Sequence, residues 1–283
     1  MTNYFYYNIP NRVLFSLGGI QVYWYGFFMV LAIFSALLLT IYLAKKYSIK
    51  KDFIIDLAFY LIIGGIIGAR LYELIIDFDY YSHNFLAIFK IWQGGLSIHG
   101  ALIGGFITLI LFINLKAKHL NTKKSLMAWH LVAIITPALA LGQAIGRWGN
   151  YFNQELFGRP TSSRFAILID IQHRPLEYIS QTHFHPTFFY ESLGNLLIFI
   201  ILIFLHKTLT KNKGLSLSVS MKIVAAYLFL YSILRFSLEF LRLDPTLILL
   251  GWRWPQIISI LIVIISTLVF IKSIYVSSKK NFS

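Results

Sequence analysis

The sequence contains no cysteine. No disulfide, thiolate metal site or thiol nucleophile can therefore come from this chain. If the chemistry of the protein needs a thiol, the thiol must arrive with the substrate. We expect no cofactor and no metal, because His183 and His185 alternate beside a proline with no third ligand at a set spacing, which is a weak metal signal.

Charged side chains are also scarce. They make up 13% of the 283 residues, about half the usual fraction in soluble domains, while 58% of the residues are hydrophobic. Together with a mean hydropathy of +0.70, this composition predicts an all-α polytopic membrane protein. The net charge of +14 comes from short basic clusters between apolar runs, with no basic face or recognition helix, so we expect no nucleic-acid partner.

Seven apolar runs are about as long as the ~20 residues that cross a bilayer. They lie at about 22–44, 54–76, 95–115, 129–147, 187–206, 221–241 and 253–275. The first run lacks the short apolar core and small-residue cleavage site of a signal peptide, so we expect it to be a retained transmembrane helix. An odd number of spans places the two termini on opposite sides of the membrane.

Lysines predict the orientation. Fifteen of the sixteen lysines cluster after the first, third, fifth and seventh spans, and only Lys90 lies elsewhere. The positive-inside rule makes that side cytoplasmic, so the N-terminus is expected in the periplasm and the C-terminus in the cytoplasm. The nine arginines avoid these clusters. Their planar fork suits phosphate or carboxylate, although arginines also extend to outer lipid headgroups.

The longest segment between spans, residues 148–186, is expected to form a small periplasmic cap within a single membrane domain over 1–283. It should have strand character around Phe165–Asp170. The stretch that enters it, from Gly142 to Glu155, reads GQAIGRWGNYFNQE and abruptly gathers polar and aromatic side chains. An aromatic and arginine belt at the membrane interface is one interpretation. A binding site is the other.

Polar residues inside the second span suggest packing. Gly64 and Gly68 are four residues apart, which is a close-packing pattern for helices in lipid. Arg70 and Glu73 are three apart and can neutralise each other on one helix face, so we expect a structural ion pair.

The third span carries His99, expected about one turn inside the helix, where an ionisable side chain suggests function. Ser97 is two residues away and faces another direction, which argues against an intramembrane serine hydrolase. The sixth span ends with Arg235 and Glu239, four residues apart. Polar groups therefore concentrate toward the outer ends of the spans, which predicts a polar cavity lined by Tyr25, His99, Arg147, Glu191 and Arg235.

Several of these motifs resemble one family. The stretches GGLSIHG (94–100), GQAIGRWGNYFNQELFGR (142–159) and HPTFFYES (185–192) are similar to those of the prolipoprotein diacylglyceryl transferases, as are WYG at 24–26 and the segment 231–242. The resemblance extends from about residue 10 to 275. One departure is Ala133, where the family commonly has an aspartate.

The resemblance implies an enzyme of the bacterial cytoplasmic (inner) membrane with its site toward the periplasm. It implies transfer of diacylglyceryl from phosphatidylglycerol to the thiol of the lipobox cysteine in the signal peptide of a preprolipoprotein. A thioether forms and glycerol phosphate leaves, in the first step of lipoprotein maturation. The family's functional positions fall on Tyr25, His99, Arg147, Asn150, Glu155, Gly158, Arg235 and Glu239.

Displacement of a phosphate ester by sulfur suggests roles for these residues. We expect Arg147, with Tyr25, Asn150, Glu155, Gly158 and Glu239, to bind phosphatidylglycerol, and His99, Arg147 and Arg235 to be catalytic. Arg235 would assist at the leaving oxygen or favour the thiolate. His99 would accept the thiol proton or serve as a structural hydrogen-bond donor. The alternatives are a secondary transporter or channel, in which intramembrane charges also occur, and a scaffolding membrane protein.

Overall fold

The computed structural model describes residues 4–91, 94–116, 124–211 and 214–279. Within them, seven helices are long and apolar enough to cross a membrane, which confirms the predicted multi-pass helical class. Their bounds are α2 Trp24–Lys46, α3 Lys51–Ile76, α5 Ile98–Lys116, α6 Lys124–Asn153, α7 Thr187–Thr210, α8 Leu217–Glu239 and α9 Trp254–Lys279. Four of the lysines used to predict the orientation, at positions 118, 123, 213 and 280, lie outside the described residues.

Short elements connect these helices. The helical ones are α1 Tyr4–Tyr7, α4 Phe78–His83, η1 Phe85–Phe89, η4 Ile171–His173 and η5 Leu176–Tyr178. The strands form three antiparallel pairs: β1 Val13–Leu17 with β2 Ile20–Tyr23, β3 Ile167–Leu168 with β4 His183–Phe184, and β5 Ile248–Leu249 with β6 Trp252–Arg253. The β3 strand confirms the strand character expected around 165–170. The β1–β2 hairpin was not expected, although Gly18 and Gly19 supply its left-handed turn, with φ of 54° and 86°.

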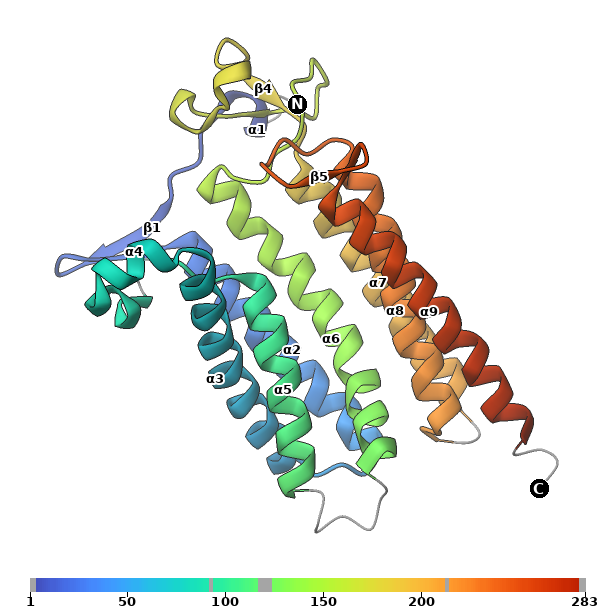
Figure 1. Ribbon diagram of the computed structural model, residues 1–283. Coiled ribbons are helices and arrows are strands. Elements are labelled where there is room, and N and C mark those ends of the chain that lie inside the picture. The colour runs from blue at the N-terminus through green and yellow to red at the C-terminus, as the bar shows by residue number, and fades with distance from the viewer. Residues whose placement is uncertain (1–3, 92–93, 117–123, 212–213, 280–283) are drawn as a thin grey trace. The chain divides into compact units, whose positions relative to one another are not determined.

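The chain divides into two compact units. One contains the chain up to Leu39 and from Val132 onward, and the other contains Thr40–Leu131. In the second unit, α3 and α5 lie side by side (Figure 1). A Cβ added at Gly64, Gly68, Gly100 or Gly104 would collide with the facing helix. The close packing predicted from the glycine spacing is therefore confirmed.

Arg70 is buried in this second unit, but its partner is not Glu73. Its guanidinium donates to the Tyr81 hydroxyl, at 2.9 Å, and to the backbone carbonyls of Ala87, Ile88, Gly94 and Gly95. The prediction of an ion pair between Arg70 and Glu73, based on the helix spacing, is therefore wrong. The backbone of the segment after α4 supplies acceptors that a helical spacing rule cannot anticipate, and together with the Tyr81 hydroxyl they engage all three guanidinium nitrogens.

In the first unit, α7, α8 and α9 run beside one another (Figure 1). Polar side chains link the helices: Ser192 Oγ donates to Ala144 O of α6 at 2.7 Å, and Ser218 Oγ donates to Ser273 O of α9 at 2.8 Å. The Tyr227 hydroxyl donates to Gln143 Oε1 at 3.2 Å. Such bonds fix the positions of helices that apolar packing in lipid leaves free to slide.

The helix α6 ends six residues beyond the expected boundary at 147. Its last turn is stabilised by aromatic packing: Tyr151 contacts Phe188 with ring centroids 5.1 Å apart, and Phe152 stacks on Trp24 at 4.7 Å. The cap therefore begins after Asn153 rather than at 148. We use "the cap" below for residues 154–186.

The cap has its own apolar core. Phe157, Ile167, Ile169 and Phe184 are buried there and pack against Tyr151 and Phe188 of the helices. Arg12, before β1, donates to Nε2 of His173. Burial and the nearby Arg12 guanidinium lower the pKa of His173, so its imidazole stays neutral and accepts this bond.

Candidate active site

Arg147 and Asn150 lie one turn apart near the end of α6. Arg147 Nη1 donates to Asn150 Oδ1 at 3.3 Å, and Asn150 Nδ2 donates to Glu155 Oε1 at 2.7 Å. Glu155 can turn back toward the helix because Gln154 and Leu156 adopt left-handed backbone angles, with φ of 52° and 57°. The helix end thus presents a guanidinium, an amide and a carboxylate in one hydrogen-bonded row.

Tyr25 reaches this row from the first turn of α2. A Cβ at Gly149 would lie 2.8 Å from the Tyr25 ring and 3.3 Å from its Cα. The glycine therefore allows α2 to approach α6 closely at this level. Tyr25 also has electrostatic interactions with Glu155 and Arg147, which places its side chain near both charges.

Glu191, on the first turns of α7, lies between two arginines. Its Oε1 is 2.6 Å from Arg147 Nη2, and its Oε2 is 3.2 Å from Arg242 Nη1. Only 2% of the Glu191 side chain is exposed, against 22% for Arg147 and 5% for Arg242. A buried carboxylate thus joins the guanidinium of α6 to the segment that follows α8.

Glu239 repeats this arrangement. Its Oε2 is 2.7 Å from Arg235 Nη1, and its Oε1 is 2.7 Å from Arg253 Nε, at the end of β6 just before α9. Asp244 connects the two centres: its carboxylate is 2.6 Å from Arg242 Nε, and its backbone carbonyl accepts from Arg253 Nη2 at 2.6 Å. The arginines predicted separately from α6 and α8 therefore belong to one network.

The network gathers four guanidinium groups in one partly buried place, and Glu155, joined to Arg147 through Asn150, lies beside it as a further carboxylate. Four guanidinium groups, from Arg147, Arg235, Arg242 and Arg253, surround three carboxylates, from Glu191, Glu239 and Asp244. Burial by itself lowers the pKa of Arg242, but Asp244 and Glu191 outweigh it and raise that pKa, so Arg242 remains charged. A partly buried site with four guanidinium groups, some of them with open N–H groups, can bind an anion such as a phosphate diester.

Arg147 and Arg235 keep part of their surface accessible. Their side chains are 22% and 20% exposed. The Arg147 fork contacts Glu191 and Asn150 through one terminal nitrogen each and also forms a hydrogen bond with Tyr231, which still leaves N–H groups for a ligand. Arg253 is 24% exposed and is a third candidate that the sequence analysis did not single out. The signal for it was present, since all nine arginines avoid the lysine clusters.

Gly158 contributes to the site through packing. A Cβ there would lie 2.8 Å from Thr187, 2.9 Å from His185 and 3.0 Å from the carbonyl of Leu241. Its backbone forms a bridge with Arg242. The residue thus lets the start of the cap run between α7 and the end of α8, beside the second arginine of the Glu191 pair.

His99 belongs to the other unit. It is the second residue of α5, so it lies in the first turn and not a turn inside the helix as expected. Its imidazole is exposed, and its ring centroid lies 5.9 Å from that of Tyr72. The segment before it is held by Arg70, which binds the carbonyls of Gly94 and Gly95.

The cap histidines have local partners. His183 stacks on Tyr6 with ring centroids 3.9 Å apart, and His185 Nδ1 lies 3.3 Å from the Tyr190 hydroxyl. Over the residues that the structure describes, no group of three metal-ligating side chains is found. Ala133 is fully buried, and its carbonyl accepts from His206 Nε2 at 2.8 Å.

Comparisons with known proteins point to one family. A family model described as prolipoprotein diacylglyceryl transferase matches residues 12–272. A phosphatidylglycerol–prolipoprotein diacylglyceryl transferase of Synechocystis sp. is 42% identical over 258 residues, covering 91% of this chain and 87% of the relative. Proteins of the same name from Nostoc sp. and Synechococcus elongatus are 38% and 40% identical, covering 90% and 89% of this chain and 87% and 83% of their own length.

Proposed function

Because the chain belongs to the prolipoprotein diacylglyceryl transferase family, we propose that its arginine network carries out the transfer of diacylglyceryl from phosphatidylglycerol to a lipobox cysteine of a preprolipoprotein. The chain is a multi-pass membrane enzyme, a transferase of lipoprotein biosynthesis. The observation that carries the assignment of the site is the cluster of four arginines held by buried carboxylates, with Arg147 and Arg235 partly accessible.

In this reaction the sulfur attacks the terminal glycerol carbon of the diacylglyceryl group. The C–S bond forms while the bond between that carbon and the phosphate oxygen breaks, and the thiol proton passes to a base. The glycerol phosphate part of phosphatidylglycerol leaves, and the diacylglyceryl group remains on the peptide as a thioether. No redox change or cofactor is needed.

Arg147 is the proposed headgroup ligand. Glu191 and Asn150 hold its guanidinium from two sides, so the planar fork is fixed before the lipid arrives. Tyr25, Glu155 and Gly158 surround this end of α6 and are proposed to shape the pocket for the glycerol of the headgroup. Two parallel N–H bonds from a fixed guanidinium match two oxygens of one phosphate.

Arg235 is proposed to stabilise charge on the leaving oxygen. Its partner Glu239 also binds Arg253, so one carboxylate is shared by two guanidinium groups. Arg235 therefore keeps a surplus of positive charge in a partly buried place, where it stabilises developing negative charge more than it would in water.

The thiol must become a thiolate to attack, because the thiolate is the nucleophile. His99 is the proposed proton acceptor, since an imidazole is the side chain that exchanges protons most readily near neutral pH. Its exposed place in the first turn of α5 leaves it accessible to substrate. The lysine distribution supports a location in the bacterial cytoplasmic membrane, with the site toward the periplasm.

One assay tests this function. Purified protein is mixed with phosphatidylglycerol vesicles and a lipobox peptide, and thioether formation is measured by mass spectrometry. Product should form with phosphatidylglycerol and be absent when the lipobox cysteine is replaced by serine. If folded protein forms no thioether, the transferase proposal fails, and flux of a solute across sealed vesicles would instead support the transporter alternative.

A further inference from the structure

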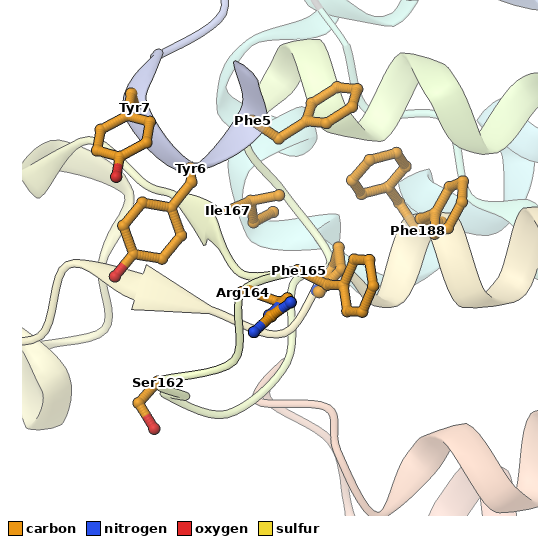
Figure 2. A pocket seen from close by; sticks show the side chains of 10 residues that line it. Phe5, Tyr6, Tyr7, Ser162, Arg164, Phe165, Ile167 and Phe188 are labelled. Carbon is orange, nitrogen blue, oxygen red and sulfur yellow. The ribbon is translucent and has the colours of Figure 1, made fainter. Parts of the chain in front are cut away.

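The cap contains a hollow of about 930 Å³ that the proposed reaction has not used. Its walls come from three separate segments: α1, the loop at 162–167 and the first turn of α7 (Figure 2). Most of its lining is aromatic, and Arg164 is the charged residue of that lining. We call this hollow the aromatic groove.

The floor of the aromatic groove is fixed and its rim is open. Ile167 and Phe188 belong to the buried core of the cap, each 3% exposed. At the rim, Tyr7 is 64% exposed and Phe165 66%. Large aromatic side chains that remain exposed beside a hollow are typical of a surface that binds another molecule.

The wall formed by α1 is held in place. His183 of β4 stacks on the Tyr6 ring at 3.9 Å, and its Nε2 lies 3.0 Å from the Tyr6 carbonyl. Phe5 packs edge-on against Tyr151 of α6, with ring centroids 5.1 Å apart. The aromatic groove is therefore already formed without a ligand, which lowers the entropic cost of binding.

A second hollow, of about 470 Å³, shares Ser162 with the aromatic groove. Its lining is polar and includes Arg159, Tyr178 and Gln181. The depression thus changes from aromatic to polar along the cap. An acyl chain would need an apolar lining throughout, whereas a polypeptide carries polar backbone groups and mixed side chains.

The aromatic groove lies close to Arg147, because the two are joined by directly packed side chains. Phe188 of its floor packs against Trp148, the residue after Arg147, with ring centroids 5.6 Å apart. Phe188 also precedes Glu191 by three residues, which is about 4.5 Å along a helix axis. A substrate whose reacting atom lies at the arginine network therefore needs only a short extension to enter the aromatic groove.

We propose that the aromatic groove binds the extended polypeptide that follows the acceptor cysteine in the prolipoprotein substrate. This rests on the proposed transferase function and assigns a second contact area for the same substrate. An extended chain advances about 3.3 Å per residue, so the first few residues after the cysteine span the distance from the thiol to the groove. Aromatic side chains hold such segments without strict sequence requirements.

The test compares two acceptor peptides, one with ten residues after the cysteine and one with a single residue. Phe165→Ala and Tyr7→Ala remove exposed rim side chains. Each should raise KM for the long peptide about tenfold, as loss of an aromatic anchor does, while KM for phosphatidylglycerol and kcat remain unchanged. Transfer to the short peptide should not change. Leu176→Ala, an 89% exposed side chain elsewhere in the cap, should alter neither peptide.

The outcomes separate the two proposals. If wild-type protein modifies neither peptide, the proposed function fails. Suppose that wild-type protein is active and both variants have a wild-type KM for the long peptide, or that their activity falls equally with both peptides. Either result would show that the groove does not hold the polypeptide. A raised KM for phosphatidylglycerol alone would make it a lipid site instead. A benzophenone side chain at position 165 should also crosslink to the long peptide, and its failure to crosslink in active protein would contradict the proposal.

Discussion

At the scale of single residues, the position of Glu191 allows the least change of its side chain. It is buried and binds Arg147 on α6 and Arg242 after α8 at the same time. Removing a carboxylate from such a place leaves two arginines without their counter-charge, and both would move or recruit water. We regard Glu191 as a positioning residue that acts through Arg147.

Glu191→Gln keeps the shape of the side chain and removes its charge. We expect kcat/KM for phosphatidylglycerol to fall about tenfold or more, and thermal stability in detergent to drop, because breaking a buried pair costs about 3–5 kcal/mol. Asp244→Asn is the comparison, since the Asp244 side chain is 31% exposed, its carboxylate pairs with Arg242, and its bond to Arg253 is made by the backbone carbonyl, which the substitution keeps. An Asp244→Asn defect larger than that of Glu191→Gln would contradict this ranking.

Arg147→Lys separates charge from geometry. A lysine keeps the positive charge but cannot bind Glu191, Asn150 and a phosphate in one plane, so kcat/KM should fall about tenfold or more. Arg174→Lys serves as the control, because Arg174 binds the carbonyls of Ile169 and Ile179 within the cap. Near-normal transfer by Arg147→Lys would rule out bidentate phosphate binding at this position.

His99→Gln tests the proton acceptor. Glutamine can still form hydrogen bonds but cannot take a proton, so kcat should fall about 10²-fold to 10³-fold with little change in KM. The matched control is His83→Gln, an exposed histidine of α4 in the same unit. A rate comparable to that of wild type would remove the general-base role and leave His99 as a structural residue.

At the scale of elements, the guanidinium of Arg70 organises the segment between α3 and α5. It binds four backbone carbonyls and the Tyr81 hydroxyl. A side chain cannot replace the hydrogen of Gly95, because its Cβ would lie 2.5 Å from Arg70 Nη1. Because this segment leads into α5, which begins at Ile98, Arg70 also helps to fix the first turn of α5, where His99 lies.

Arg70→Met should therefore lower the unfolding temperature, and Arg70→Lys should not restore it. One ammonium group cannot reach five acceptors, and the carbonyls of this partly buried segment would lose their partners. Both variants should unfold at clearly lower temperature than wild type in the same detergent. Glu73→Gln should unfold at the wild-type temperature, because Glu73 does not pair with Arg70. Equal stability of Arg70→Lys and wild type would overturn this account.

Arg70 also shows which structural features could be predicted from the sequence. Hydropathy predicted the seven spans, and glycine spacing predicted the contact of α3 with α5, because both depend on residues close together in the chain. The partners of Arg70 could not be predicted this way, because they lie 11 to 25 residues further along the chain. For Arg147, the sequence placed Glu191 in the same cavity, but the direct pair between them, across 44 residues, comes from the folded chain.

The same reasoning applies to the end of α6, which continues beyond the polar boundary of the span. Polarity rises sharply at Arg147, which suggested the end of a membrane span, but the helix continues to Asn153. Aromatic packing of its last turn against Phe188 and Trp24 stabilises the extra residues. The longer helix is what places Arg147 and Asn150 on one face, so the site depends on the feature that hydropathy missed.

At the scale of the whole molecule, lysines separate from arginines. Except for Lys90, the described lysines lie toward the ends of α2, α5, α7 and α9 and toward the starts of α3, α6 and α8, whereas the network and the cap contain arginine. Lysine near helix ends sets the direction of insertion, and arginine supplies directed hydrogen bonds. The cap should therefore face the opposite side of the membrane from the loop that joins α7 and α8.

The absence of native cysteine makes this orientation testable without altering the rest of the chain. Leu176→Cys places a thiol on the exposed surface of the cap, and Lys211→Cys places one at the exposed end of α7. In intact cells whose outer barrier has been permeabilised, a membrane-impermeant maleimide should label Leu176→Cys. It should label Lys211→Cys only after the cytoplasmic membrane is disrupted. The unmodified chain, with no thiol, gives the background. The reverse labelling pattern would place the arginine network on the cytoplasmic side, where a prolipoprotein cysteine emerging on the other face could not reach it, and the proposed mechanism would then have to be abandoned.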